Sequence, residues 1–159
     1  MILKSHQVNK VNLEQNKFLL FYGKNDGYKT EITENLIKSR QNILTYEEKE
    51  ILDNSNDFIE SLVSKSLFES EKIIIIKRAT DKILKIFENI ISKKINDLNV
   101  IINADNLEKK SKLRTYFEKN KKFVCVAFYP DNEQTLFKLA YNFLKGKKIS
   151  ISSSNLNLI

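Results

Sequence analysis

The sequence predicts an α/β fold in which a mostly parallel sheet carries helices on both faces, giving three layers. Short apolar runs alternate along the chain with segments whose apolar residues recur at helical spacing. The runs are continuously apolar, which is typical of strands buried on both faces. The 159 residues are 42% hydrophobic and 30% charged, a composition that fits one packed domain.

Each strand and helix can be placed in chain order. Strands are expected near residues 18–22, 43–46, 73–76, 98–102 and 123–127. Helices are expected over residues 28–40, 55–66, 83–91 and 109–120, followed by a last helix over 131–146 that Gly146 ends. That last helix is expected to bury its apolar residues, which are Leu136, Phe137, Leu139, Ala140, Phe143 and Leu144.

Charge and cysteine content limit the possible functions. The net charge is +7, from 27 basic and 20 acidic residues, and this charge favours polyanionic partners. A high lysine content can also reflect an AT-rich coding sequence, which is the alternative explanation. One cysteine and one histidine exclude an internal disulfide and a Cys/His zinc site. No apolar run is long enough for a signal peptide or a membrane span, so we expect a cytoplasmic protein without a membrane partner.

The turn after the first strand has the spacing of a phosphate loop, G-x-x-x-x-G-K-[ST]. Gly23, Lys29 and Thr30 match this pattern, but Tyr28 stands where the second glycine should be. The tyrosine ring would occupy the space that a phosphate needs. We favour a plain strand-to-helix turn with a solvated Lys29, and weak nucleotide or anion binding at the helix N-terminus is the alternative.

A second element of ATP hydrolysis is also missing. The third strand runs into Lys77 and Arg78, where a carboxylate should hold magnesium. Cys125 lies in the middle of the fifth strand and is expected to be a buried, inert thiol. Three glutamates indicate a solvated acidic turn; they are Glu47, Glu48 and Glu50. We therefore predict no catalytic residues, no metal site and no cofactor.

Leu67 and Phe68 stand at the end of the second predicted helix. Two adjacent bulky residues at that place are either packed under the following loop or offered to a partner as an anchor. From the pattern alone, both interpretations remain open.

Several segments together resemble the delta subunit of the bacterial DNA polymerase III clamp loader. They are Gly23-Lys24-Asn25-Asp26, Ser66-Leu67-Phe68 before the strand Lys72 to Lys77, Val100 to Leu107, and the lysine-rich helix containing Leu113, Tyr116 and Phe117. These segments occur in the family's order over the whole chain.

The resemblance implies an AAA+-like fold with a degenerate phosphate loop and no ATPase activity of its own. It implies that Leu67 and Phe68, supported by Ser66, insert into a pocket on the beta sliding clamp and open that ring. It implies further partners: other clamp-loader subunits, contacted through a C-terminal region, and DNA within the complex. Residues 1–146 would form the AAA+-like, clamp-binding domain, and residues 147–159 would begin a helical lid.

Two rival functions remain open. One is a degenerate nucleotide-binding domain, a small nucleotidase or kinase that uses Gly23, Lys29 and Thr30. The other is direct nucleic-acid binding by basic side chains of the fourth predicted helix and its flanks. Those side chains are Lys109, Lys110, Lys112, Arg114, Lys119, Lys121 and Lys122.

Overall fold

A single parallel sheet organises the protein, whose computed structural model describes residues 1–64, 71–152 and 155. Its strands are β1 (Ile2–Lys4), β2 (Phe18–Tyr22), β3 (Ile43–Glu47), β4 (Lys72–Ala79), β5 (Leu98–Ala104) and β6 (Val124–Ala127). The strand order is β1-β6-β2-β5-β4-β3, and every pairing is parallel. The five predicted strands are confirmed in place and direction.

Strand β1 was not predicted from the sequence. Its three residues pair with Cys125, Val126 and Ala127 of β6, and the terminal amino group of Met1 donates to the Phe123 carbonyl oxygen. The strand lies at the edge of the sheet, and Ile2 is 62% exposed. Because β1 is held mainly by backbone pairing, it leaves no apolar run in the sequence.

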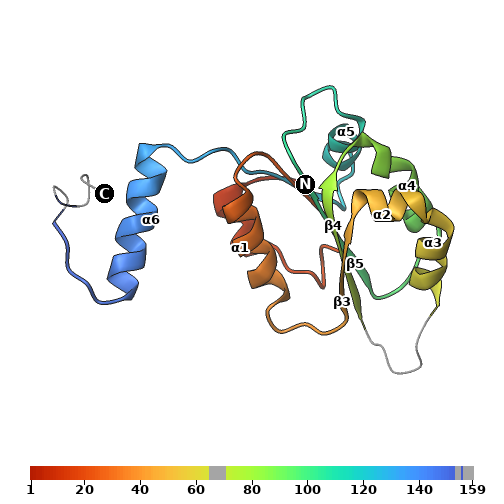
Figure 1. Ribbon diagram of the computed structural model, residues 1–159, viewed down its shortest axis with the longest axis horizontal. Helices are drawn as coiled ribbons and strands as arrows, with labels where there is room; N and C mark the ends of the chain where they lie inside the picture. Colours follow the sequence, from red (N-terminus) through yellow and green to blue (C-terminus); the bar gives the residue numbers. More distant parts are fainter. Residues whose placement is uncertain (65–70, 153–154, 156–159) are drawn as a thin grey trace. The chain divides into compact units, whose positions relative to one another are not determined.

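Helices cover both faces of the sheet (Figure 1). They are α1 (Asp26–Ile37), α2 (Glu48–Asp53), α3 (Ser55–Val63), α4 (Leu84–Ser92), α5 (Lys112–Lys119) and α6 (Glu133–Gly146), with 3₁₀ turns η1 (Ser5–Lys10) and η2 (Asp81–Ile83). Helix α1 and η1 pack on one face, and α2 to α5 pack on the other. No helix among the described residues is both long and apolar enough to cross a membrane.

The strands are continuously apolar because both of their faces are buried. In β5, Val100 and Ile102 face the α2–α5 side, whereas Ile101 faces α1, and all three are fully buried. The same alternation holds in β4 and β2. This arrangement is the three-layer α/β fold that the sequence predicted.

The chain divides into two compact units, Met1–Phe128 and Tyr129–Ile159. This division comes before α6, whereas the sequence placed a boundary after residue 146; the lid beginning at 147 stays a prediction. The expected interior face of α6 is wrong, because none of its residues is buried. Leu136, Leu139 and Phe143 are 51%, 58% and 64% exposed.

Cys125 is fully buried in β6, as predicted. Desolvation by burial, aided by the charge of Glu118, raises the pKa of its thiol to about 12, although Arg114 and the terminal amino group act in the opposite direction. The reactive thiolate is therefore scarce at neutral pH.

Asp81 fixes the start of helix α5 from a different part of the chain. Its carboxylate accepts hydrogen bonds from the Ser111 hydroxyl (2.6 Å) and from the N–H groups of Lys112 and Leu113 (3.0 Å each). Burial acts to raise the Asp81 pKa, but these hydrogen bonds and the charge of Lys112 outweigh it. The pKa therefore lies below its ordinary value of 3.8.

Replacing Asp81 with alanine should lower the free energy of unfolding by about 1–2 kcal/mol at neutral pH, because three helix-capping hydrogen bonds are lost. A carboxyl whose pKa is lower in the folded state stabilises the protein above its unfolded-state pKa, and this stabilisation disappears as pH falls through the folded-state value. Urea unfolding of both proteins, at neutral pH and well below pH 3.8, checks this. A difference that does not shrink with acid would contradict it.

Candidate functional site

The turn after strand β2 is closed by hydrogen bonds within the protein. The Gly23 N–H donates to the Asp105 carbonyl oxygen (3.0 Å), and the Asn25 N–H donates to the Phe128 carbonyl oxygen (3.3 Å). Gly23 has φ +123°, and a Cβ there would collide with the Phe128 carbonyl group. In a nucleotide-binding loop, amides of this turn face the phosphates. Here two of them already have protein acceptors.

Tyr28 occupies space next to this turn, at the position of the missing glycine. Asn25 caps helix α1, and its side-chain oxygen accepts the Tyr28 N–H (3.1 Å). The Tyr28 ring packs edge-on against Phe128, with ring centroids 5.5 Å apart. The tyrosine thus joins the helix start to the end of the neighbouring strand β6, and its ring adds apolar packing to the turn.

Lys29 is buried, so the expectation of a solvated lysine is wrong. Only 4% of the residue is exposed. Its ammonium donates to the Ala104 carbonyl oxygen at the end of β5 (2.7 Å) and pairs with the Asp26 carboxylate (2.8 Å). A buried cation is tolerated when it is paired and hydrogen-bonded. The Asp26 carboxylate therefore balances the charge of Lys29, and the Ala104 carbonyl oxygen accepts a hydrogen bond from its ammonium.

Thr30 and Arg78 are the other positions at which nucleotide chemistry was considered. Thr30 is exposed, and no cluster of three His, Cys, Asp or Glu residues suited to a metal ion occurs in the described ranges. At the end of β4, Arg78 adopts φ +53° beside an irregularity in the strand pairing, and its side chain is 82% exposed. Its closest carboxylate is Glu47, at 3.7 Å.

Glu48 is not part of a solvated turn, so this expectation is wrong. The segment forms helix α2, and Glu48 is only 7% exposed. Its carboxylate accepts the Thr80 N–H (2.7 Å) and the Thr80 hydroxyl (2.9 Å). The sequence gives no signal for this pairing because the partners are 32 residues apart. Glu48 therefore connects helix α2 to the turn after β4, and its carboxylate has a structural role.

Three of the lysines considered for DNA contact lie at the start of α5. Lys109 and Lys110 precede the helix, Lys112 is its first residue, and all three are exposed. Lys110 pairs with Glu108 at 3.0 Å on the surface. The exposed positions are compatible with a polyanion, and contact with DNA stays a prediction.

Arg114 differs from these lysines because it is held inside the protein. Its guanidinium donates to Glu118 (2.8 Å) and to the Leu107 carbonyl oxygen (3.2 Å), and it lies over the Tyr22 ring at 4.9 Å. The side chain is 18% exposed. These contacts join α5 to the end of β2 and give Arg114 a structural role.

The predicted clamp-binding residues Ser66, Leu67 and Phe68 lie outside the described residues. Helix α3 ends at Val63, which is 50% exposed, and the next residue that the structure describes after Ser64 is Glu71. The role of the Leu-Phe pair in clamp binding therefore stays a prediction.

Comparison with known proteins identifies similarity to one family. The family model described as DNA polymerase III, delta subunit, matches residues 9–127. A search of curated proteins found no match.

Among solved structures, a Bacillus subtilis DNA clamp loader delta protein has a TM-score of 0.66 and 14% identity to this chain; the match covers 96% of this chain and 49% of that one. A Walker-type ATPase of Pyrococcus abyssi has a TM-score of 0.54 and 10% identity, over 96% and 60% of the two chains. AMPPCP-bound DnaA from Aquifex aeolicus has a TM-score of 0.54 and 13% identity, over 96% and 52%. These similarities show an AAA+-like fold, as predicted, and this chain spans about half the length of the Bacillus subtilis protein.

Gly23 and Gly27 provide a matched pair of substitutions. Gly23→Ala should destabilise the protein by at least about 1–3 kcal/mol, because it places a Cβ at positive φ and against Phe128. Gly27→Ala, inside α1 with nothing within 4 Å of the added Cβ, should instead stabilise it by about 0.5–1 kcal/mol. Urea unfolding of the two variants measures both effects. Equal effects would contradict the closed turn.

Magnesium-ATP should not raise the melting temperature of this chain, and the chain should not hydrolyse it. The reason is that Lys29 and two amides of the loop already have protein partners. Lys29→Ala should lower the free energy of unfolding by about 1–3 kcal/mol, since it leaves the buried Ala104 carbonyl oxygen without its donor, whereas the Asp26 carboxylate is 75% exposed and remains solvated. Thermal melts with and without magnesium-ATP, beside a phosphate-release assay, check both statements. ATP turnover that disappears in Lys29→Ala would contradict the first.

Proposed function

Because this chain belongs to the DNA polymerase III delta subunit family, we propose that it works in a bacterial clamp loader, where it binds and opens the beta sliding clamp. The observation that carries the proposal is the family match over residues 9–127, which spans nearly all of the first compact unit. The clamp, the other subunits and the DNA are the partners that follow from this role. The chain would act in the cytoplasm as a noncatalytic part of the replication machinery.

The closed phosphate loop supports a subunit that does not hydrolyse ATP. The ammonium of Lys29 pairs with Asp26 and with the end of β5, so nucleotide binding would have to break both interactions. The same contacts argue against a small nucleotidase or kinase that uses Gly23, Lys29 and Thr30. ATP used by other subunits would then control when this chain meets the clamp.

The clamp contact that we propose is made by Leu67 and Phe68, with Ser66 supporting them. Burying each of these large side chains in a pocket would contribute about 1.5–3 kcal/mol. Two such anchors are enough to dominate an interface whose other contacts are nearly neutral. Clamp-binding peptides of this kind often begin with glutamine, whereas this chain has Val63 or Ser64 there, and its rim contacts therefore differ.

The proposed action is mechanical. A ligand shifts a conformational equilibrium only by its difference in affinity for the two states. The Leu-Phe pair must therefore bind a distorted or opened clamp interface more tightly than the closed one. No bond is made or broken by this chain in such a mechanism.

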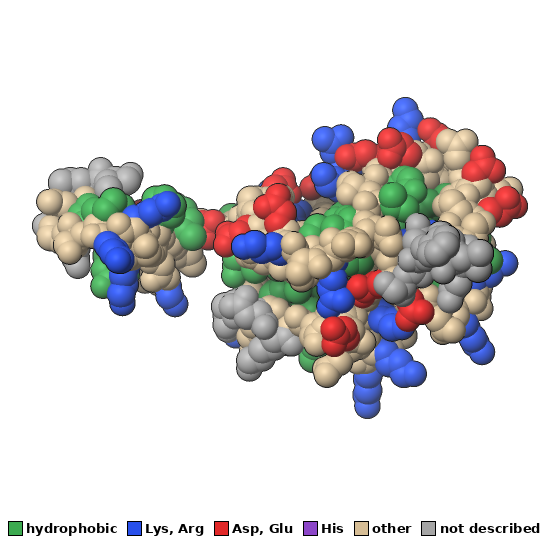
Figure 2. All heavy atoms as spheres, turned by 90° about the horizontal axis from the view of Figure 1, so that it is seen from below, with side chains coloured by type: hydrophobic (Ala, Val, Ile, Leu, Met, Phe, Trp, Pro, Cys, Tyr) green, Lys and Arg blue, Asp and Glu red, His purple; other side chains and the backbone are tan. Residues whose placement is uncertain are grey.

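Contact with DNA is a second part of the proposal, limited to the exposed lysines at the start of α5. Lys109, Lys110 and Lys112 would face phosphate groups within the assembled complex, while Arg114 would hold the helix in place. On the face shown in Figure 2, basic side chains are interspersed with acidic ones. We therefore expect a local contact with DNA, in which the net charge of +7 plays little part.

Replacing both Leu67 and Phe68 with alanine should abolish binding to the clamp and change the free energy of unfolding by less than about 0.5 kcal/mol. The physical reason is that a pair reserved for a partner's pocket is not part of the core. A calorimetric titration against the sliding clamp of the same organism and a thermal melt measure the two quantities. If the melt collapsed or if the affinity survived, this assignment of the pair would fall.

A further inference from the structure

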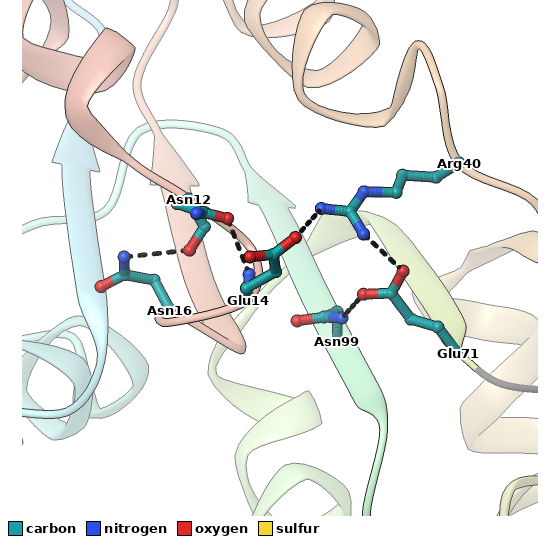
Figure 3. A network of polar contacts seen from close by, with 6 residues as sticks. All are labelled: Asn12, Glu14, Asn16, Arg40, Glu71 and Asn99. Atoms are coloured by element: carbon teal, nitrogen blue, oxygen red, sulfur yellow. Dashed lines mark hydrogen bonds and ion pairs between the residues drawn. The ribbon is translucent and has the colours of Figure 1, made fainter.

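Glu71, the residue directly before strand β4, is held by side chains from two other parts of the chain, and Figure 3 shows Arg40 and Asn99 on its carboxylate. One carboxylate oxygen pairs with Arg40 (2.9 Å), and the other accepts the side-chain N–H of Asn99 in β5 (2.7 Å). The Glu71 carbonyl oxygen accepts from the Asn42 side chain (3.4 Å). Arg40 also reaches Glu14 at 3.4 Å. We call Arg40, Glu71 and Asn99 the strand-entry network.

The next residue, Lys72, connects the two described ends of the chain on either side of residues 65–70. Its ammonium donates to the Ser61 carbonyl oxygen in α3 (2.9 Å), and its N–H donates to the Asp97 carbonyl oxygen (2.9 Å). On the α3 side, the Ser64 N–H and hydroxyl both donate to the Glu60 carbonyl oxygen (2.9 Å each). The points where the chain leaves α3 and enters β4 are therefore fixed relative to the sheet.

The network uses polar groups where the neighbouring residues are aliphatic. Asn99 is 2% exposed and stands between Leu98 and Val100 in β5, and its side-chain oxygen has no hydrogen-bond partner among the described residues. Such a buried amide lowers stability relative to an aliphatic residue of similar size. The sheet itself is already held in register by β4 pairing with β5 from Lys72 to Ala79. What the network adds is a fixed position for Glu71.

We propose that Arg40 and Glu71 are positioning residues for clamp binding, because they fix the place from which the segment containing Leu67 and Phe68 reaches β4. This inference rests on the proposed function. A fixed attachment point lowers the conformational entropy that binding must remove. The free energy of ordering one residue corresponds to about a tenfold change in an equilibrium constant.

The test is a calorimetric titration of the full chain and its variants with the sliding clamp of the same organism, well below every melting temperature. Arg40→Ala should weaken clamp affinity about tenfold, and Arg40→Lys, which can still pair with Glu71, should recover part of the loss. Arg78→Ala removes the same charge from an 82% exposed side chain and should leave affinity unchanged. Asp81→Ala lowers stability far from the network and should also leave it unchanged.

Hydrogen exchange provides a second readout, since the Lys72 amide should exchange faster in Arg40→Ala while the Leu113 amide should not. If Arg40→Ala does not fold, Glu71→Gln replaces it, because it keeps an acceptor for Asn99 while weakening the pair with Arg40. Unchanged clamp affinity in the network variants, together with lost affinity in the Leu67 and Phe68 double variant, would overturn only this inference. A wild-type chain that did not bind the clamp would overturn the proposed function and this inference with it.

Discussion

The interaction on which the start of helix α1 depends is the buried hydrogen bond of the Lys29 ammonium to the Ala104 carbonyl oxygen, beside its ion pair with the exposed Asp26. In a nucleotide-binding relative of this fold, the corresponding cation would be satisfied by phosphate only while a nucleotide is bound. Here the partners belong to the chain, so the charge is neutralised in every state of the folded protein. The contact also ties α1 to the central strand β5. Lys29 is therefore a packing contact of the fold, and its partners are present without a ligand.

The fold could be predicted from the sequence because its signal is local and repetitive. Each inner strand is a continuous apolar run, and the period changes to that of a helix between runs. The features that were missed depend on partners distant in sequence. Lys29 meets a carbonyl group 75 residues away, and Glu48 meets Thr80 across 32 residues. Strand β1 depends on backbone pairing, which has no side-chain pattern in the sequence. Helix α6 has an apolar face, but none of its residues is buried.

Of the candidate site, the sequence predicted a degenerate phosphate loop but not the contacts that its residues make. Tyr28 was expected to block phosphate, and its ring does pack into the turn against Phe128. Lys29 also pairs with Asp26, a residue three positions earlier on the same helix face, where an ion pair at that spacing is common. That spacing was a usable signal. Two amides of the loop donate to the backbone carbonyl oxygens of Asp105 and Phe128. Because every residue has such a carbonyl group, these acceptors could not be predicted from the sequence.

The two edges of the sheet therefore serve different purposes. At the carboxyl ends of the strands, where parallel α/β sheets usually bind ligands, polar groups are paired internally through Lys29, Glu48 and Asp81. At the amino ends, the strand-entry network holds Glu71 in place. The proposed ring-opening role would require the chain to transmit force through its own body, and any segment that yields would absorb part of the binding energy. Internal closure of one edge and fixed attachment at the other both reduce such yielding, which supports the mechanical role that we propose.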